Sequence, residues 1–134
     1  MKWKKECTDI SNSREIVCKE HRRQIIFLNP GGKEVKKIRI DGCQITAGKR
    51  CDCLVIAANT QHFVELKGKH IKTAIEQLKR CIVMLGKSGY RKKSYIITSR
   101  SPFTSAEIQN FKLKFKRATG SDLVIRNKEI TVFL

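Results

Sequence analysis

Acidic residues, proline and long apolar runs are all scarce in this chain of 134 residues. It has 12 Asp and Glu against 29 Lys and Arg, which gives a formal net charge of +17, and it has only two prolines. Its apolar runs, such as 53–58 and 81–85, are far shorter than the roughly 20 residues that a membrane-spanning helix needs. Hydrophobic residues make up 40% of the chain, enough for a core, which argues against wholesale disorder. We therefore expect a single folded domain with no membrane partner.

The N-terminus and the cysteines bear on the compartment. The chain starts with basic residues, but it stays polar through Glu15 and lacks the apolar stretch of a signal peptide. We therefore expect a cytoplasmic protein whose six cysteines are thiols rather than a disulfide framework. No two cysteines have the Cys-x-x-Cys spacing of a zinc knuckle, so packing in the core is favoured over a zinc site built from cysteines and His21.

The excess of positive charge runs along the whole chain and is not confined to a tail. A folded domain this basic repels itself unless a polyanion neutralises it, and DNA and RNA are the commonest polyanions in the cytosol. Because the charge is not gathered on one amphipathic helix, a membrane surface is a poorer fit. We expect a nucleic-acid partner, DNA rather than RNA.

Turn signals and hydrophobic spacing divide the chain into short elements. The segment 29–33 is a strong turn signal, Thr104 and Glu107 form a capping box, and Gly86 and Gly120 stand where helices end. The expected elements are a short helix near 14–21, a β-hairpin of strands 24–28 and 34–40, strands 53–57 and 62–67, a helix 71–85, a strand 95–98, a helix 105–119, and strands 123–125 and 130–134. This order predicts an α/β fold, with a mixed β-sheet flanked by helices.

One group of charged residues lies among the apolar strands. Side chains alternate along a strand, so Glu65 and Lys67 share a face. If the turn between the strands centres on 59–60, antiparallel pairing places Asp52 opposite Lys67 and diagonal to Glu65, roughly 7 to 8 Å away. Two such carboxylates, with the main-chain carbonyl of Leu66, can hold Mg²⁺, while the lysine positions an attacking water. The group suits metal-dependent hydrolysis of phosphodiester bonds.

The spacing of Asp52, twelve intervening residues and Glu65-x-Lys67, with apolar flanks and a following helix, resembles the PD-(D/E)XK nuclease superfamily. The resemblance implies a restriction-endonuclease-like fold: a helix, three antiparallel strands, a helix and a further strand over about 15–100, with 104–134 as an elaboration. It also implies a Mg²⁺- or Mn²⁺-dependent endonuclease with Asp52 and Glu65 as metal ligands and Lys67 as the catalytic lysine. Glu20, on the expected first helix, would be a further acidic catalytic residue. Cys51 stands where the motif has proline.

Other polar residues are candidate contacts to the substrate. His62 and His70 flank the motif and could transfer a proton or contact phosphate, although an ordinary place on the surface is favoured for both. A basic run before one strand and two lysines of the second helix are the predicted nucleic-acid contacts: Arg91, Lys92, Lys93, Lys112 and Lys116.

Three alternatives to a DNA endonuclease stay open. The first is a nucleic-acid-binding module on the same fold without catalysis, and the second is an RNase with the same metal site. The third is a structural subunit whose charge meets an acidic protein. A nuclease this small could also act as a homodimer that cuts both strands, but no segment identifies an interface.

Overall fold

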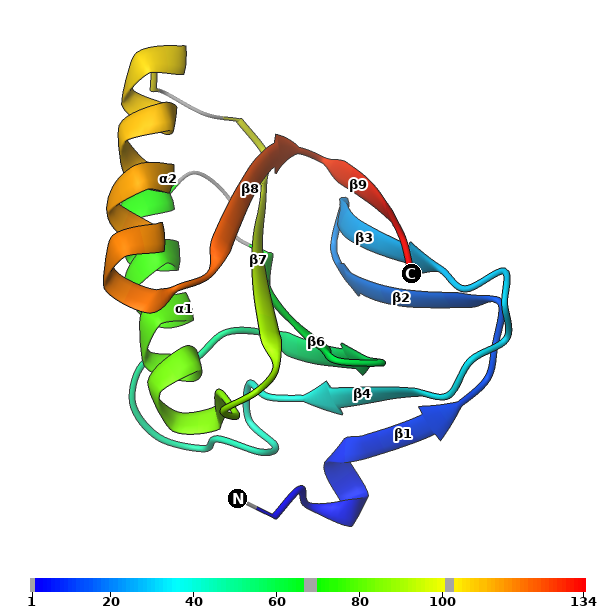
Figure 1. Ribbon diagram of the computed structural model, residues 1–134. Coiled ribbons are helices and arrows are strands. Elements are labelled where there is room, and N and C mark those ends of the chain that lie inside the picture. The colour runs from blue at the N-terminus through cyan, green and yellow to red at the C-terminus, as the bar shows by residue number, and fades with distance from the viewer. Residues whose placement is uncertain (1, 67–69, 101–102) are drawn as a thin grey trace.

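The computed structural model describes residues 2–66, 70–100 and 103–134, and it divides them between two β-sheets and one helical layer (Figure 1). The larger sheet has six strands in the spatial order β1 (Thr8–Ser11), β4 (Val35–Arg39), β5 (Cys53–Ala57), β6 (Thr60–Leu66), β7 (Arg91–Thr98) and β8 (Asp122–Asn127). The smaller sheet has the order β2 (Glu15–Glu20), β3 (Arg23–Leu28) and β9 (Glu129–Phe133). The helices are α1 (Ile71–Leu85), α2 (Ser105–Thr119) and a short 3₁₀ turn, η1 (Lys5–Cys7).

Both sheets are mixed. Strands β1, β4, β5 and β6 pair antiparallel, whereas β6, β7 and β8 pair parallel. The parallel pairs are joined through α1 and α2, as parallel strands require. In the smaller sheet β3 pairs antiparallel with β2 and parallel with β9. The mixed α/β class predicted from the sequence is confirmed.

Helices cover only one face of the six-stranded sheet, and the three-stranded sheet covers the other (Figure 1). On the helical side, Leu54 and Phe63 pack with Leu78 of α1 and Phe115 of α2. On the opposite side, Val55 and the strands beside it pack against β2, β3 and β9. Strand β5 is buried along its whole length because both faces are covered, which explains its unbroken apolar sequence. The predicted helices therefore flank this sheet on one face, and a second sheet that was not predicted covers the other.

Two of the three predicted helices are present. Apolar residues at helical spacing bury one face of α1, which ends at Gly86. The capping box of Thr104 and Glu107 opens α2, and Gly120 ends it with a φ of +76°, a conformation that glycine adopts without strain. Phe115 is the fully buried residue of α2, whereas Ala118 is exposed.

Two predictions for the first 40 residues are wrong. The segment expected to be a helix forms strand β2, in which every second residue, Ile16 and Cys18, points into the core. The strands expected to form a hairpin belong to different sheets, β3 and β4. The turn between them carries the chain from one sheet to the other. Asn29, which is buried, holds this turn by donating from its side-chain amide to the carbonyl oxygens of Ser13 and Lys33, at 2.9 and 2.8 Å.

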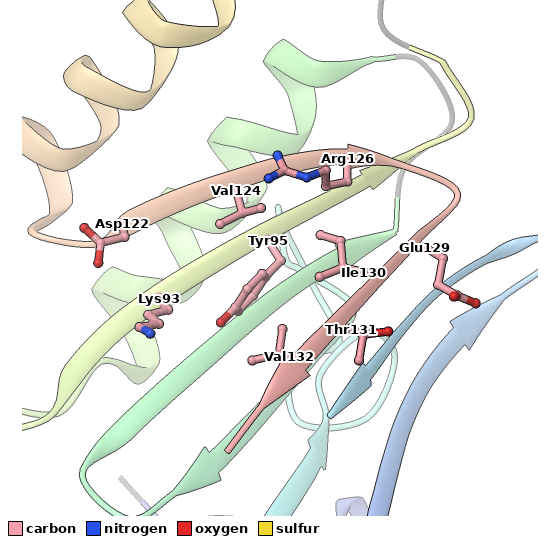
Figure 2. Close-up of a pocket in the computed structure, with 9 residues that line it drawn as sticks. All are labelled: Lys93, Tyr95, Asp122, Val124, Arg126, Glu129, Ile130, Thr131 and Val132. Carbon is pink, nitrogen blue, oxygen red and sulfur yellow. The ribbon is translucent and has the colours of Figure 1, made fainter. Parts of the chain in front are cut away.

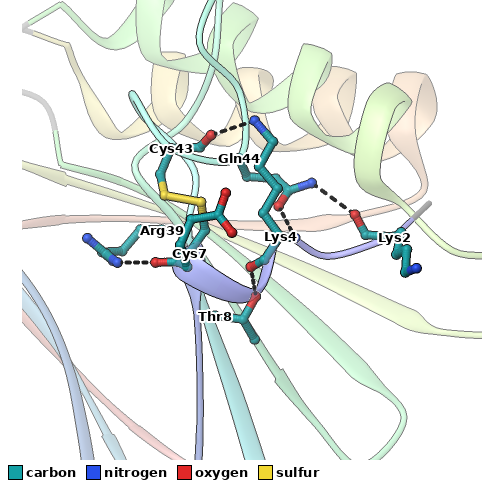
Figure 3. Close-up of a disulfide and its surroundings, with 8 residues drawn as sticks. Lys2, Lys4, Cys7, Thr8, Arg39, Cys43 and Gln44 are labelled. Carbon is teal, nitrogen blue, oxygen red and sulfur yellow. Dashed lines mark hydrogen bonds between the residues drawn. A yellow bond between two sulfur atoms is a disulfide. The ribbon is translucent and has the colours of Figure 1, made fainter.

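Four of the six cysteines form disulfides, so the expectation of six thiols is wrong. Cys7 is bonded to Cys43, which ties the N-terminal segment to the loop after β4 (Figure 3). Cys18 of β2 is bonded to Cys53 of β5, which joins the two sheets. Cys51 and Cys81 are free thiols buried in the core, and Cys81 belongs to α1. The sequence could not show these pairings because each joins residues about 35 positions apart.

Within the described ranges, no helix has the length and hydropathy needed to cross a membrane.

Candidate functional site

The two carboxylates singled out in the sequence lie together at one end of the six-stranded sheet. Strand β5 begins just after Asp52, and Glu65 is the second-last residue of β6. The Asp52 Oδ2 accepts a hydrogen bond from the backbone N–H of Leu66 at 2.6 Å, and its carboxyl group is also hydrogen-bonded to that of Glu65. Glu65 is only 2% exposed. The structure thus places a buried and a partly buried carboxyl group side by side where β5 and β6 meet.

The backbone holds Asp52 from both sides. Its N–H donates to the carbonyl oxygen of Val64 on β6, and its carbonyl oxygen accepts from the N–H of Ile40, just after β4, both at 3.0 Å. These bonds continue the sheet by one residue beyond the end of β5. Asp52 is therefore held in place by its neighbours on two strands, and its side chain has a defined direction.

A cavity of about 290 Å³ opens beside this pair, between the two sheets. Its acidic residues are Asp52, Glu20 of β2 and Asp41, which follows β4. The Cys18–Cys53 disulfide and Leu66 also line it. Glu20 thus lies at the predicted site, although it arrives there on a strand and not on the expected helix.

The electrostatic setting of Asp52 is unfavourable for a negative charge. The pKa of Asp52 is raised from 3.8 to about 6, chiefly by burial and also by repulsion from Glu20 and Asp41, against the lowering effect of the Leu66 and Glu65 hydrogen bonds. Around neutral pH the group is nonetheless largely ionised, since its pKa lies about one unit below 7. Among the residues that the structure describes, no cationic side chain forms an ion pair with it.

The predicted pairing within the site is off by two residues. The turn lies at Ala58 and Asn59, because Ala57 pairs with Thr60, and the register of β5 and β6 ends with Cys53 opposite Val64. The backbone N–H of Asp52 also bonds to Val64, so Asp52 lies close to the adjoining Glu65 at the end of this pairing. Lys67, the predicted catalytic lysine, lies outside the described residues.

No set of three or more His, Cys, Asp or Glu side chains is arranged to hold a metal ion, as far as the structure describes the chain. Asp41 is directed elsewhere, since its Oδ1 lies 2.7 Å from the Nε of Arg50. The acidic side chains that could hold an ion are therefore Asp52 and Glu65, with Glu20 lining the cavity beside Asp52.

The predicted nucleic-acid contacts lie away from this cavity. Arg91 pairs with Thr60 at the opposite end of β6 from Glu65, whose partner on β7 is Ile96. Five residues of strand separate these rows, a distance of about 16 Å. Lys116 forms an ion pair with Asp122 at 2.9 Å, at the same far end. The remaining predicted contacts are Lys92 and Lys93, which follow Arg91, and Lys112 on α2 in the helical layer.

Three basic residues that the sequence analysis did not single out line the cavity instead: Lys19, Lys37 and Arg39. Lys37 and Arg39 are two positions apart on β4, so they share the face that is turned to the smaller sheet, and Lys19 lies on β2. The sequence showed that Lys37 and Arg39 share a face. It did not show that β2 covers this face, so their place beside Asp52 could not be predicted.

His62 does not lie on the surface, contrary to expectation. It is 3% exposed, its Nδ1 is 2.9 Å from the hydroxyl oxygen of Tyr95, and its ring packs edge-on against Phe27. Burial lowers the pKa of His62 to about 4, with a further contribution from the positive charge of Lys93. A neutral, buried imidazole has a structural role in the core. His70, in contrast, is exposed just before α1.

A larger cavity, of about 440 Å³, lies between β7, β8 and β9 (Figure 2). Tyr95, Val124 and Ile130 line its middle, as Figure 2 shows. Its acidic side chains are already engaged, since Asp122 pairs with Lys116 and Glu129 accepts a hydrogen bond from Gln24. Size alone therefore favours this cavity, but the chemistry favours the one beside Asp52.

Comparison of the chain with protein-family models, with curated proteins and with solved structures found no match.

Proposed function

We propose that this protein is a metal-dependent nuclease that hydrolyses phosphodiester bonds, in DNA more readily than in RNA. The observation that carries the proposal is the pair of Asp52, partly buried, and Glu65, fully buried, which are hydrogen-bonded to each other beside an open cavity. Two carboxyl groups this close are costly to ionise together, because both charges would lose hydration and repel each other. Binding a divalent cation would offset this cost.

The pair fits Mg²⁺ or Mn²⁺ by its chemistry. Magnesium keeps several waters and is commonly bound by one or two carboxylates together with phosphate oxygens of the substrate. A set of three protein side chains is therefore not required. Asp52 and Glu65 would hold the ion, with Glu20 within the same cavity. The bound ion would activate a water and stabilise the negative charge that builds up on the phosphate.

The chain's own residues would supply orientation. The Leu66 N–H fixes the Asp52 Oδ2, which holds the carboxyl group in one orientation. Burial of Glu65 keeps its carboxyl group in a single environment, since the residue is only 2% exposed. Lys67 keeps the role predicted from its spacing, which is to position the attacking water. The three antiparallel strands β4, β5 and β6, followed by α1 and β7, support a restriction-endonuclease-like core, with β2 in place of the first helix.

The substrate class rests on charge. A formal net charge of +17 favours a polyanion, and the cavity beside the carboxylates offers three cationic side chains to a phosphate. A non-catalytic nucleic-acid-binding module is the second candidate. It is favoured by the lack of a ligand set of three acidic or metal-binding side chains within the described ranges.

A cleavage assay separates these functions. Wild-type protein is incubated with supercoiled, linear, branched and single-stranded DNA and with RNA, each with Mg²⁺, with Mn²⁺ or with EDTA. The proposal expects cleavage that needs the metal and that Asp52→Asn, Glu65→Gln and Lys67→Ala each abolish, while nucleic-acid binding persists. Asp9→Asn, on the exposed strand β1, is the matched control and should cleave like wild type. Tight binding without cleavage of any substrate would select the non-catalytic module, and cleavage of RNA alone would select an RNase.

A further inference from the structure

The cavity beside the carboxylate pair has a basic wall as well as an acidic one. Arg39 and Lys37 of β4 and Lys19 of β2 line it, together with Asp52 and Glu20. We propose that Arg39 and Lys19 bind the phosphate on which the site acts. This inference rests on the proposed function, and it identifies residues that hold the substrate.

The cations are not there to neutralise the acidic side chains. Among the residues that the structure describes, no ion pair joins Lys19 or Arg39 to Glu20, Asp41 or Asp52. Cations and carboxylates thus line one cavity without forming pairs. A phosphodiester could interact with both groups of side chains. Its negative oxygens would bind the cations, and it would share a metal ion with the carboxylates.

Arg39 is held so that it can present its guanidinium group. It pairs with Cys53 across the sheet, and Cys53 follows Asp52 directly, so Arg39 lies one residue from the carboxylate pair along the strand. Its Nη2 donates to the carbonyl oxygen of Glu6 at 2.5 Å, which anchors one side of the guanidinium. The remaining N–H groups form a planar fork, the geometry that binds two phosphate oxygens at once.

Lys19 is placed by the disulfide beside it. The disulfide between Cys18 and Cys53 fixes β2 next to the start of β5. Lys19 follows Cys18 and Asp52 precedes Cys53, so each of them adjoins this disulfide. Lys19 is exposed and lines the cavity. Lys37 has a different role, because its Nζ donates to the carbonyl oxygen of Val17 at 2.6 Å and so links β4 to β2.

The predicted basic run at the other end of the sheet cannot bind the same phosphate. Arg91 lies about 16 Å from the row of Glu65, as counted along the strands. Successive phosphates of one strand advance about 3.4 Å along a duplex. A contact from Arg91 would therefore reach a phosphate several nucleotides away from the bond that is cleaved.

The test compares two double variants that remove the same charge. Lys19→Gln/Arg39→Gln alters the basic wall, and Lys33→Gln/Arg117→Gln removes one lysine and one arginine at exposed positions outside the cavity. Binding of a fluorescein-labelled 12-nucleotide single-stranded DNA is followed by anisotropy in EDTA from 50 to 300 mM NaCl. Cleavage of the substrate that wild type prefers is followed with Mg²⁺, and thermal melting checks the fold of each variant.

We expect Lys19→Gln/Arg39→Gln to weaken binding about 10-fold at low salt and to reduce the slope of log K against log [salt] by one to two, as loss of one or two phosphate contacts predicts. Its kcat/KM should fall at least 100-fold, whereas the control variant should stay within about 3-fold of wild type. Arg39→Lys keeps the charge but loses the fork, so it should preserve the salt slope and still lower kcat.

The outcomes separate this inference from the proposed function. If wild type cleaves and both double variants bind and cleave alike, Arg39 and Lys19 do not hold the phosphate, although the nuclease proposal stands. If wild type cleaves nothing but the basic-wall variant alone loses salt slope, the phosphate site stands and the nuclease proposal fails. Equal loss of binding in both double variants would show that only total charge matters and would overturn the inference.

Discussion

Replacing Asp52 by asparagine should stabilise the metal-free protein at alkaline pH. Burial raises the pKa of Asp52 from 3.8 to about 6, so the folded state resists the charged form more than the unfolded state does. A carboxyl group with a raised pKa lowers the free energy of unfolding progressively as pH rises from about 4 through 6, and the full cost is present above that range. At about 1.4 kcal/mol for each pH unit, this cost reaches about 3 kcal/mol.

Asparagine should remove the cost and keep the local structure. Its side-chain oxygen can accept the Leu66 N–H in place of the Asp52 Oδ2, and its amide can donate to the Glu65 carboxyl group. We therefore expect Asp52→Asn to raise the free energy of unfolding by about 1–3 kcal/mol at pH 8, with little or no gain at pH 4. The same variant should lose all cleavage.

Urea unfolding in EDTA at pH 4, 6 and 8, followed by circular dichroism, measures the difference between variant and wild type. Asp9→Asn removes the same charge from the exposed strand β1 and controls for the effect of net charge. A variant that is less stable than wild type at pH 8, or a difference that does not change with pH, would refute the view that Asp52 is held in a setting unfavourable for its charge.

Three further predictions concern the scaffold around the site. His62 should titrate near pH 4 by NMR, and burial of its neutral ring should stabilise the fold fully above about pH 6.5 and less as the pH falls toward 4. Tyr95→Phe removes the hydrogen-bond partner of His62 and should lower the free energy of unfolding by about 1–2 kcal/mol. Replacing Cys18 and Cys53 by serine should lower it by about 2–4 kcal/mol in urea unfolding, because the disulfide closes a loop of 35 residues. Thr104→Ala should cost about 1 kcal/mol in the same assay by removing the cap of α2, whereas Thr104→Ser should be nearly neutral.

The location of the carboxylate pair could be predicted because it depends on local rules. Alternation along β6 and a short turn before it bring Asp52 close to Glu65, whichever residues form the turn. The register was wrong because Ala58 adopts a φ of +52° and takes part in the turn, a conformation that its sequence does not announce. The two helices were predictable for the same reason, since their spacing and caps are local signals.

The smaller sheet could not be predicted, because it depends on contacts between distant segments. Strand β3 pairs with β9, about 100 residues later in the chain. The sequence of β2 has only Ile16 and Cys18 as core residues, too few to distinguish a strand from a short helix. The basic wall depends on β2 lying over β4, so Arg39 and Lys19 could be recognised only once both sheets were in place.

The central claim is that Asp52 and Glu65 bind a divalent cation, and a titration with Mn²⁺ followed by electron paramagnetic resonance tests it most directly. The titration is made at pH 7.5 with wild type, Asp52→Asn and Asp9→Asn, each with and without a 12-nucleotide phosphorothioate DNA. We predict one bound Mn²⁺ per chain in wild type and in Asp9→Asn, tighter when the DNA is present, and its loss in Asp52→Asn. Equal binding by Asp52→Asn and wild type, or no bound Mn²⁺ in wild type with the DNA present, would contradict the account.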